Sequence, residues 1–486
     1  MKRFAAGALL ALLALPVMAA PAALVKDINP GPSGSDPRHL VTFDGAVLFF
    51  ASFGLWRSDG TAGGTFALTG EQLSDPRPFL VTEDLYFFLD AHPALAPAGL
   101  WVSDGTEAGT VRLTSPGVSV DWLPRGGTVA AGQDTVYFMA RDPEHGPELW
   151  STDGTPAGTR LVADIRPGTE GSAIEWLTEY KGQVWFYADD GQHGFALWRS
   201  DGTAAGTVLA IDLPALPPVT DSQPIWAVGD RLVFMAPGPN GGLRLWAGDG
   251  TVQGTAPIKA FTGLFDSMVR GNRLYLAAET GKGQEVWVTD GTARGTKALT
   301  NFPKRDALSG LGPVFDPRSV NGRFLFRADD GPHGVELWTT DGSRQGTRLL
   351  HDVFPGGLSG DGFVLAAFNG RLYFRAQSRT RGYELWSTDG RSARFVADIC
   401  PGSCSSVPSD PFVFDGFFYF VAQDGEHGYE IWATRGRAAE TFPTTEFALR
   451  YPWEEEDGFQ GAVLGDKLLF AADDGVHGLE LWVLAP

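Results

Sequence analysis

The stretch ELWSTDGTPAGT (residues 148–159) decides the fold of this chain, because the sequence repeats it. Each clear copy keeps a Trp and, three residues later, Asp-Gly-Thr. The clearest further copies are GLWRSDGTAGGT (54–65), GLWVSDGTEAGT (99–110), ALWRSDGTAAGT (196–207), RLWAGDGTVQGT (244–255) and EVWVTDGTARGT (285–296). Such a stretch encodes a recurring piece of structure, a ligand site, or both.

The marker Trp recurs about every 47 residues and spans nearly all of the 486-residue chain. A repeat of 20–50 residues is typical of solenoids and propellers. The last three copies depart from the pattern, with ELWSTDGRSAR from residue 384, EIWATRGRAAE from residue 430 and ELWVLAP at the end. The marker residues are Trp56, Trp101, Trp150, Trp198, Trp246, Trp287, Trp338, Trp386, Trp432 and Trp482.

Each repeat divides into four short strands, which we call a, b, c and d in chain order. In the fourth repeat, residues 174–180 predict strand a, QVWFYA (183–188) strand b, FALWRS (195–200) strand c and VLAIDL (208–213) strand d. Strands a and b are joined by pairs such as Asn321-Gly322, Asn369-Gly370, Asp44-Gly45 and Asp415-Gly416. Asn-Gly and Asp-Gly between apolar runs are strong hairpin signals.

An all-β propeller of about ten four-stranded antiparallel blades follows from this pattern. The chain opens with an isolated d strand, LVKDI (24–28), and ends on a c strand, LELWVL (479–484). We therefore predict that the N-terminal strand completes the last blade, which removes the open sheet edges. The propeller domain is assigned to residues 24–486. The alternative is two five-bladed propellers split near residue 250, but the turn there is intact, which favours one ring.

The N-terminal residues, the net charge and the cysteines indicate the cellular compartment and the class of partner. Lys2, Arg3 and the apolar run at 4–15 are typical of a signal peptide, assigned to residues 1–20. We expect a secreted, periplasmic or cell-surface protein without a transmembrane segment. The net charge of −20 argues against nucleic acid as a partner. In an exported chain the only two cysteines, Cys400 and Cys404, predict a local disulfide.

The stretches ELWSTDGTPAGT, ALWRSDGTAAGT and DINPGPSGS (27–35) resemble the ELWxxDGT repeat family of exported bacterial proteins, which are also described as hyalin-repeat-like. The resemblance covers essentially all of the chain after residue 23. It weakens in the eighth and ninth repeats, where Arg391 replaces the Thr and Arg435 the Asp. The family implies export and a repeat fold, and it implies no catalytic residues.

The Asp-Gly-Thr turn has a structural interpretation for every residue. Asp153 can accept hydrogen bonds from N–H groups that follow it, and the hydroxyls of Thr155 and Thr159 can bind the loop to itself. Gly154 and Gly158 are expected to supply positive φ angles. We favour this interpretation over a calcium site.

The loop between strands b and c carries the candidate ligand residues. It reads DDGQHG (189–194), DDGPHG (329–334), QDGEHG (423–428) and DDGVHG (473–478), with RDPEHG (141–146) as a relative. Carboxylates and imidazoles can bind a divalent cation, and Ca²⁺ is favoured over Zn²⁺ because no His pair has ligand spacing. Asp-Gly turns with a bridging His are the structural alternative. The candidates are Asp189, Asp190, His193, Asp329, Asp330, His333, His427, Asp473, Asp474 and His477.

The sequence predicts the fold in more detail than the function. No linear catalytic motif occurs, so we name no catalytic residue and lean toward no enzymatic activity. We expect a non-enzymatic binding scaffold for an extracellular protein or carbohydrate, with no cofactor except possible Ca²⁺. A carbohydrate-active enzyme with its site at the ring centre and a calcium-stabilised structural module remain alternatives. Any site is expected on the face that bears the b–c and d–a loops, which also bears the acidic WEEEDG (453–458).

Overall fold

The structure is a computed structural model, and it describes residues 22–70, 73–90, 98–120, 129–131, 135–212, 224–237, 242–302, 314–445 and 459–485. These residues form β-strands joined by turns, and the single helix among them is a short 3₁₀ helix, η2 (Ala438–Glu440). No helix in this part of the chain is long and apolar enough to cross a membrane. The expected signal peptide and WEEEDG lie outside the described residues.

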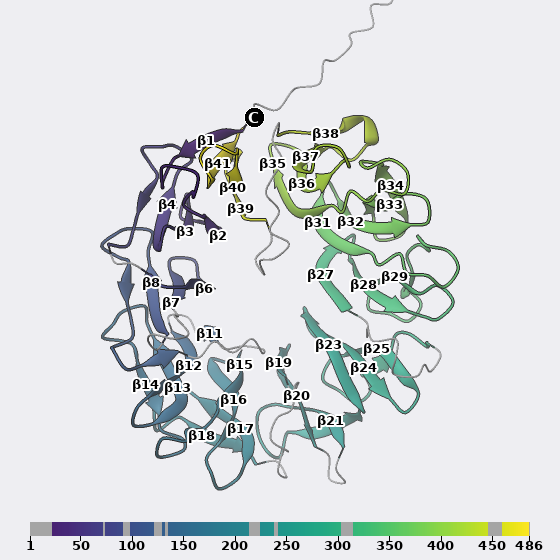
Figure 1. The fold of residues 1–486 in the computed structure, drawn as a ribbon. Helices are drawn as coiled ribbons and strands as arrows, with labels where there is room; N and C mark the ends of the chain where they lie inside the picture. The colour runs from purple at the N-terminus through teal and green to yellow at the C-terminus, as the bar shows by residue number, and fades with distance from the viewer. Residues whose placement is uncertain are drawn as a thin grey trace, which may run out of the picture.

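The strands form ten antiparallel sheets arranged as blades around a ring (Figure 1). The first blade contains β2 (Arg38–Phe43), β3 (Ala46–Ala51), β4 (Gly54–Ser58) and β5 (Phe66–Ala67), and the second contains β6 (Pro76–Val81), β7 (Tyr86–Asp90), β8 (Gly99–Ser103) and β9 (Val111–Arg112). The third contains β10 (Ser119–Val120), β11 (Val129–Ala131), β12 (Val136–Asp142), β13 (Gly146–Thr152) and β14 (Arg160–Ala163). The fourth contains β15 (Glu175–Tyr180), β16 (Gln183–Asp189), β17 (Phe195–Ser200) and β18 (Val208–Ile211), and the fifth contains β19 (Ile225–Val228), β20 (Arg231–Pro237), β21 (Leu243–Gly248) and β22 (Ala256–Ala260). In the third blade two short strands, β10 and β11, share the a position, because both pair with β12.

The other five blades continue the same order. The sixth blade contains β23 (Gly263–Arg270), β24 (Arg273–Thr280), β25 (Gly283–Thr289) and β26 (Lys297–Ala298), and the seventh contains β27 (Val314–Val320), β28 (Arg323–Asp329), β29 (Val335–Thr340) and β30 (Arg348–Leu349). The eighth contains β31 (Phe363–Phe368), β32 (Arg371–Ser378), β33 (Gly382–Thr388) and β34 (Ala393–Ala397), and the ninth contains β35 (Ser409–Phe414), β36 (Phe417–Gln423), β37 (Tyr429–Thr434) and β38 (Thr441–Pro443). The tenth contains β39 (Gly461–Leu464), β40 (Lys467–Asp473), β41 (Leu479–Leu484) and β1 (Ala23–Lys26).

The N-terminal strand closes the ring, as the sequence predicts. β1 pairs antiparallel with β41 and supplies the d strand of the tenth blade. Leu24 lies opposite Trp482, and Ala23 lies opposite Val483. The first and last strands are therefore neighbours in one sheet, which leaves no unpaired edge on β41.

The core shows that the ring is single. Each of the ten apolar clusters among the described residues draws side chains from two successive blades. One cluster packs Val233 and Leu245 of the fifth blade against Leu276 and Trp287 of the sixth, across the suggested split near residue 250. Another joins Phe49 of the first blade to the tenth. Two five-bladed rings are excluded, because neither half closes on itself.

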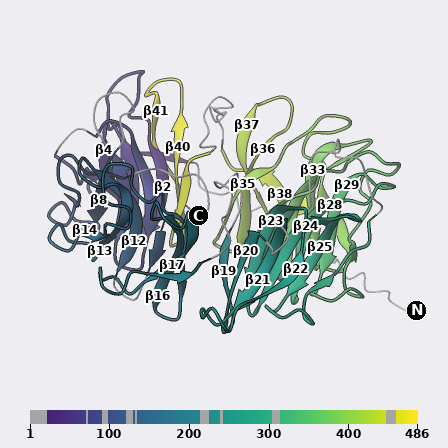
Figure 2. The ribbon, with the colours of Figure 1, turned by 90° about the horizontal axis from the view of Figure 1, so that it is seen from below.

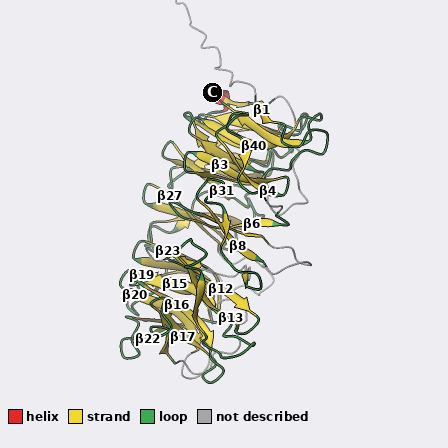
Figure 3. Ribbon diagram, turned by 90° about the vertical axis from the view of Figure 1, so that its left-hand side faces the viewer, coloured by secondary structure: helices red, strands yellow, loops and turns green. Residues whose placement is uncertain are grey.

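The order of the strands fixes which loops share a face. The a strands lie nearest the ring centre (Figure 1), and seen from below and from the side the strands run between the two faces of the ring (Figures 2 and 3). In an antiparallel a-b-c-d sheet the b–c and d–a loops emerge together, opposite the a–b and c–d turns. We call the first of these the loop face. The a–b turns take the expected form, with positive φ at both Asn369 (46°) and Gly370 (69°).

Candidate functional site

The Asp-Gly-Thr turn forms a closed hydrogen-bond network. The N–H and the hydroxyl of Thr155 donate to Asp153 Oδ1 at 2.9 and 2.7 Å. The Thr155 Oγ1 accepts the Gly158 N–H at 3.0 Å, and Thr159 Oγ1 donates to the Thr155 carbonyl at 2.8 Å. The Thr155 hydroxyl bond holds the pKa of Asp153 below its usual value. The turn therefore uses its polar groups internally, as the structural interpretation predicts.

The two glycines of this turn act differently. Gly154 has the expected positive φ (88°). Gly158 is outside that region, which corrects the prediction for it. A Cβ on Gly158 would instead come within 2.1 Å of Asp153 Oδ1, so this glycine makes room for the carboxylate that organises the turn.

The Glu of the repeated Glu-Leu-Trp has a role that the sequence did not reveal. The side chain of Glu384 is fully buried and accepts the Ile399 N–H at 2.8 Å and the Ser406 hydroxyl at 2.8 Å. Both donors belong to the following d–a segment. Burial raises the pKa of Glu384 to about 7. The matching Glu148 and Glu480 accept N–H groups of their own d–a segments in the same way, which fastens the loop face of those blades.

The predicted b–c loop residues form small, separate Asp–His units. In the fourth blade Asp190 accepts the backbone N–H of His193 at 2.8 Å and contacts its Nδ1 at 2.7 Å. The side-chain hydrogen bond to Asp190 raises the pKa of His193. The preceding Asp189 accepts the Gly191 N–H at 2.8 Å and pairs with Arg166. Each His is therefore held by its own loop, and the expected bridge to a neighbouring blade is not made by Nδ1.

The remaining candidates repeat this arrangement around the ring. Asp330 contacts His333 Nδ1 and Asp474 contacts His477 Nδ1, each at 2.8 Å. Asp329 and Asp473 accept the N–H of Gly331 and Gly475. His427 pairs with Asp424, which the sequence analysis did not select, at 2.7 Å. Within the described residues, only this loop gathers three ligand-type groups, Asp424, His427 and Glu430.

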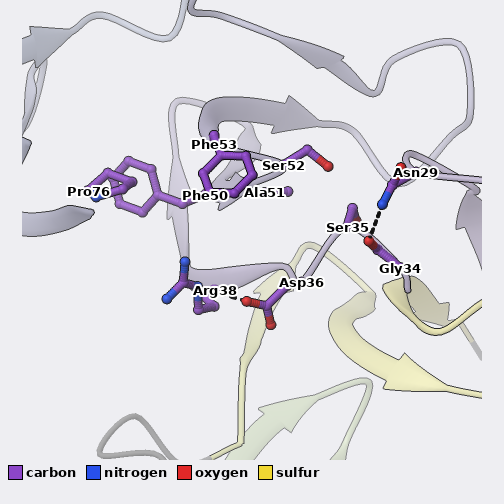
Figure 4. A pocket seen from close by; sticks show the side chains of 10 residues that line it. All are labelled: Asn29, Gly34, Ser35, Asp36, Arg38, Phe50, Ala51, Ser52, Phe53 and Pro76. Carbon is purple, nitrogen blue, oxygen red and sulfur yellow. Dashed lines mark hydrogen bonds and ion pairs between the residues drawn. The ribbon is translucent and has the colours of Figure 1, made fainter. Parts of the chain in front are cut away.

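The first blade departs from the pattern and opens a pocket instead. Its b–c connection is the two-residue turn Ser52-Phe53, where the fourth, seventh, ninth and tenth blades have five residues between the two strands. The sixth blade also has a two-residue connection, which is Gly281-Lys282. The pocket beside it has a volume of about 330 Å³. Its lining comes from the d–a segment before β2 and from strands of the first two blades: Asn29, Gly34, Ser35, Asp36, Arg38, Phe50, Ala51, Ser52, Phe53 and Pro76 (Figure 4). We call this the first-blade pocket.

The first-blade pocket has an aromatic side and a charged side. Figure 4 shows the rings of Phe50 and Phe53 on one side and Asp36 and Arg38 across from them. Arg38 Nε lies 3.2 Å from Asp36 Oδ2, and both side chains are partly exposed. Phe50 is buried, but Phe53 is 63% exposed. The pocket thus offers an apolar surface and ionised groups to the same ligand.

The residue types rather than the backbone conformation set this turn apart, because the a–b turn Asn369-Gly370 has the same positive φ angles and Ala173 matches Asp36 in another d–a segment. Ser52 (φ 45°), Phe53 (φ 64°) and Asp36 (φ 55°) all adopt the left-handed region. A bulky residue there costs of order 1 kcal/mol or more, which Gly or Asn would largely avoid. Because Phe53 is also exposed, its ring gains little from burial. Strain of this kind clusters at functional sites.

A local departure in the sequence marks this pocket. The run FFASFGLW (49–56) lacks the Asp-Gly-x-His-Gly of the b–c loop and places Phe where a two-residue hairpin usually has Gly or Asn. In a chain of similar repeats, such a departure marks the place where the ring is not uniform.

A second departure lies in the seventh and eighth blades. Arg327 of β28 and Arg375 of β32 occupy the b-strand position that holds the buried Tyr187 in the fourth blade. Their guanidinium carbons lie 6.0 and 5.1 Å from the ring centre of Phe363, which is 46% exposed. Arg327 also pairs with Asp361 at 3.0 Å. This group, which we call the arginine pair, lies toward the loop face.

Comparison with known proteins finds distant similarity to several solved structures. No protein-family model matches the sequence, and no curated protein matches it. The resemblance to the ELWxxDGT family therefore stays a prediction. Among solved structures, the chain is similar to a puromycin hydrolase at 16% identity and a TM-score of 0.37, over 71% of this chain and 58% of that one. It is also similar to the acylaminoacyl peptidase of Pyrococcus horikoshii (14%, 0.31, 72% and 57%) and to the GH74 enzyme of Niastella koreensis (10%, 0.35, 93% and 71%).

These comparisons correct the functional prediction. The similar chains include several peptidases and a GH74 enzyme, so the expectation of a non-enzymatic binding scaffold is withdrawn. The lack of a linear catalytic motif does not exclude an enzyme, because a propeller can build a site from loops of several blades. At these identities the likeness concerns the fold, and no catalytic residue is transferred.

Proposed function

We propose that this protein is an exported carbohydrate-active enzyme and that its sugar-binding site is the first-blade pocket. The observation that carries the proposal is Phe53, an aromatic ring 63% exposed on a left-handed backbone at a pocket whose opposite side is charged. The folded chain gains little from this ring, so a ligand is the natural partner for it.

A sugar ring matches both sides of the pocket. Its C–H face packs on an aromatic ring, and its hydroxyls need donors and acceptors at fixed positions. Arg38 supplies charged donors and Asp36 a charged acceptor, and hydrogen bonds to ionised groups are the stronger kind. The volume of about 330 Å³ lies at the lower end of the range for small-ligand pockets. One or two sugar units fit this description.

Catalysis would depend on carboxylates at the pocket. Hydrolysis of a glycosidic bond normally uses two of them, as acid and as base or nucleophile. Asp36 is the acidic residue in the pocket lining, and Asp75 directly precedes Pro76 of that lining. Asp75 is paired with Arg77 at 3.2 Å. These two aspartates are therefore the first candidates for catalytic residues.

The arginine pair suggests the charge of the substrate. Arg327 and Arg375 lie toward the loop face, in a protein whose net charge is −20. Guanidinium groups bind carboxylates well, and the exposed Phe363 adds a second surface for a sugar ring. We therefore expect acidic oligosaccharides, such as those containing uronic acids, to be preferred over neutral ones.

The test is a panel of neutral and acidic oligosaccharides incubated with the purified chain, with binding followed by ligand-observed NMR and hydrolysis by release of reducing ends. Phe53→Ala should weaken binding about fivefold, because an aromatic contact contributes roughly 1 kcal/mol. Asp36→Asn should abolish hydrolysis. Phe66→Ala is the matched control, since Phe66 is also exposed (44%) but lies on the outer strand β5. If no saccharide binds, or if both Phe variants behave alike, the proposal is wrong.

A further inference from the structure

Two arginines of the eighth blade lie side by side on the face opposite the loop face, which we call the turn face. Arg371 begins β32 directly after the a–b turn, and Arg394 lies near the start of β34, after the c–d turn. The Nε atoms of both donate to the hydroxyl oxygen of Ser387, each at 3.1 Å. Ser387 is fully buried, so this shared acceptor holds the two guanidinium groups together. We call Arg371 and Arg394 the turn-face arginines.

The positive charge of the turn-face arginines is not neutralised by a neighbouring acid. Neither forms an ion pair with a described residue, and the described residues include every a–b and c–d turn of the seventh, eighth and ninth blades. Asp389, the carboxylate of their own c–d turn, accepts the backbone N–H groups of Arg391 and Ser392 instead. Burial and the charge of Arg394 lower the pKa of Arg371, and Asp389 opposes only part of this shift. Two cations held this close repel each other.

The seventh blade shows the same position in a neutralised form. Arg323 begins β28 as Arg371 begins β32, and its Nη2 pairs with Asp341 at 3.2 Å. The Nη1 of Arg323 also donates to the carbonyl of Gly346 at 2.8 Å. An arginine at this position can therefore be compensated by the Asp of its own c–d turn. In the eighth blade this ion pair is not formed.

The ninth blade brings a further arginine where the other turns bring an acid. The Nη2 of Arg394 donates to the carbonyl of Gly436 at 3.2 Å, in the c–d turn of the ninth blade. Arg57 of the first blade makes a comparable contact with the c–d turn of the second blade, and that turn carries Asp104. In the ninth blade Arg435 stands in place of this Asp and is exposed. The contact that would place a carboxylate beside the turn-face arginines therefore adds positive charge.

We propose that Arg371 and Arg394 bind a phosphate group, carried by a free phosphate ion or by a phosphate monoester. A guanidinium group matches the oxygens of phosphate with parallel N–H donors. Each guanidinium has five such donors, and the contacts above with Ser387 and Gly436 use only two in each. A phosphate monoester carries a charge of about −1.5 to −2 at pH 7, which matches two uncompensated arginines better than the single charge of a carboxylate.

The site is separate from the first-blade pocket, because that pocket is built from the b–c turn and the d–a segment of the loop face. The inference therefore does not rest on the proposed function. It also gives a role to the last repeats, whose c–d turns depart from Asp-Gly-Thr by gaining arginines.

The test is a calorimetric titration of the full chain with inorganic phosphate and with glucose 1-phosphate. The wild type should bind with a Kd of about 1 mM or tighter, and binding should weaken as NaCl is added, because salt screens the charges. Arg394→Gln should weaken binding about tenfold. Arg323→Gln, which removes an arginine that is already paired, is the matched control and should leave the Kd unchanged. A tighter Kd for glucose 1-phosphate would identify a phosphorylated saccharide as the ligand, and a tighter Kd for inorganic phosphate would identify the free ion.

A second measurement separates binding from general stabilisation. Phosphate stabilises many proteins by exclusion from their surface, so the informative quantity is the rise in melting temperature relative to each variant at equal phosphate concentration. The wild type and Arg323→Gln should show the same rise, and Arg394→Gln a smaller one. Acetate, which carries a single charge, should bind more weakly than phosphate. The proposal is overturned if the wild type shows no saturable phosphate binding, if Arg394→Gln and Arg323→Gln have equal effects, or if acetate binds as tightly as phosphate.

Discussion

At the scale of single residues, the Thr of each Asp-Gly-Thr turn is the hydrogen-bonding centre. Thr155→Val removes the bond to Asp153 and leaves the Gly158 N–H without its acceptor. We expect a loss of about 1 kcal/mol in the free energy of unfolding, discounted for the exposure of the turn. Urea denaturation measures this change. A variant within about 0.3 kcal/mol of wild type would show that water replaces these bonds at no cost.

The eighth blade allows the reverse experiment. Arg391 stands where the turns of the first six blades have Thr. Asp389 accepts the backbone N–H groups of Arg391 and Ser392 at 2.8 Å and the Ser392 hydroxyl at the longer distance of 3.4 Å. Arg391→Thr restores the missing hydroxyl and should raise the free energy of unfolding by about 0.5 kcal/mol. A decrease in the same denaturation experiment would show that this turn no longer has the geometry of its relatives.

Residue roles were predictable where the partners are close in sequence. Asp153, Thr155 and Gly158 lie within one turn, so the sequence indicated their network. Glu480 binds N–H groups at the opposite end of the chain, and no local pattern reveals such a contact.

At the scale of single elements, the hairpin between β3 and β4 is expected to be less stable than an Asn-Gly hairpin, because its turn carries the exposed Phe53 ring. Replacing Ser52-Phe53 with Asn-Gly, the pair that this turn favours, should raise the free energy of unfolding by about 1 kcal/mol. The same change should remove saccharide binding. Thermal denaturation measures the change in stability, and the saccharide-binding assay measures the loss of binding. A destabilised variant would mean that the Phe53 ring packs on the chain more than its 63% exposure indicates.

The strands and the turns between them were predicted from the sequence more completely than the side-chain contacts. The order of strands a to d, the Asn-Gly turns and the complementary role of β1 all follow from periodic sequence and are confirmed by the sheet pairing. The first-blade pocket was missed because it arises from a shorter loop rather than from an added motif. Comparing each repeat with its neighbours, rather than with known motifs, would have found it.

At the scale of the whole molecule, buried acids and paired histidines should make stability depend on pH. Burial raises the pKa of Glu336 and Glu384 to about 7, so the folded chain holds these protons more tightly than the unfolded chain. Their contribution falls as pH rises from about 4.5 to 7. The b–c histidines have raised pKa values through their hydrogen bonds to Asp, and their contribution is also lost as pH rises through the folded pKa.

The turn aspartates act in the opposite direction at low pH. Their lowered pKa values, seen for Asp153 and Asp201, add stability above the unfolded value of 3.8 that is lost as pH falls toward the folded pKa. We therefore expect the highest melting temperature between about pH 4 and 5, with a decrease from about pH 5 to pH 8. Calorimetric scans across this range measure it, and a melting temperature that rises toward pH 8 would contradict the assignment of the raised values.

The pairing of β1 with β41 means that the ring has no privileged starting point. Ala23 lies opposite Val483, so a copy of the seven-residue turn DGTPAGT could join the two ends, as it joins strands c and d in the third blade. The polypeptide could then be reopened at another hairpin, and each such permutant should reach the same ten-bladed ring. The fold requires only the order of the blades around the ring, so the blade at which the polypeptide begins is arbitrary.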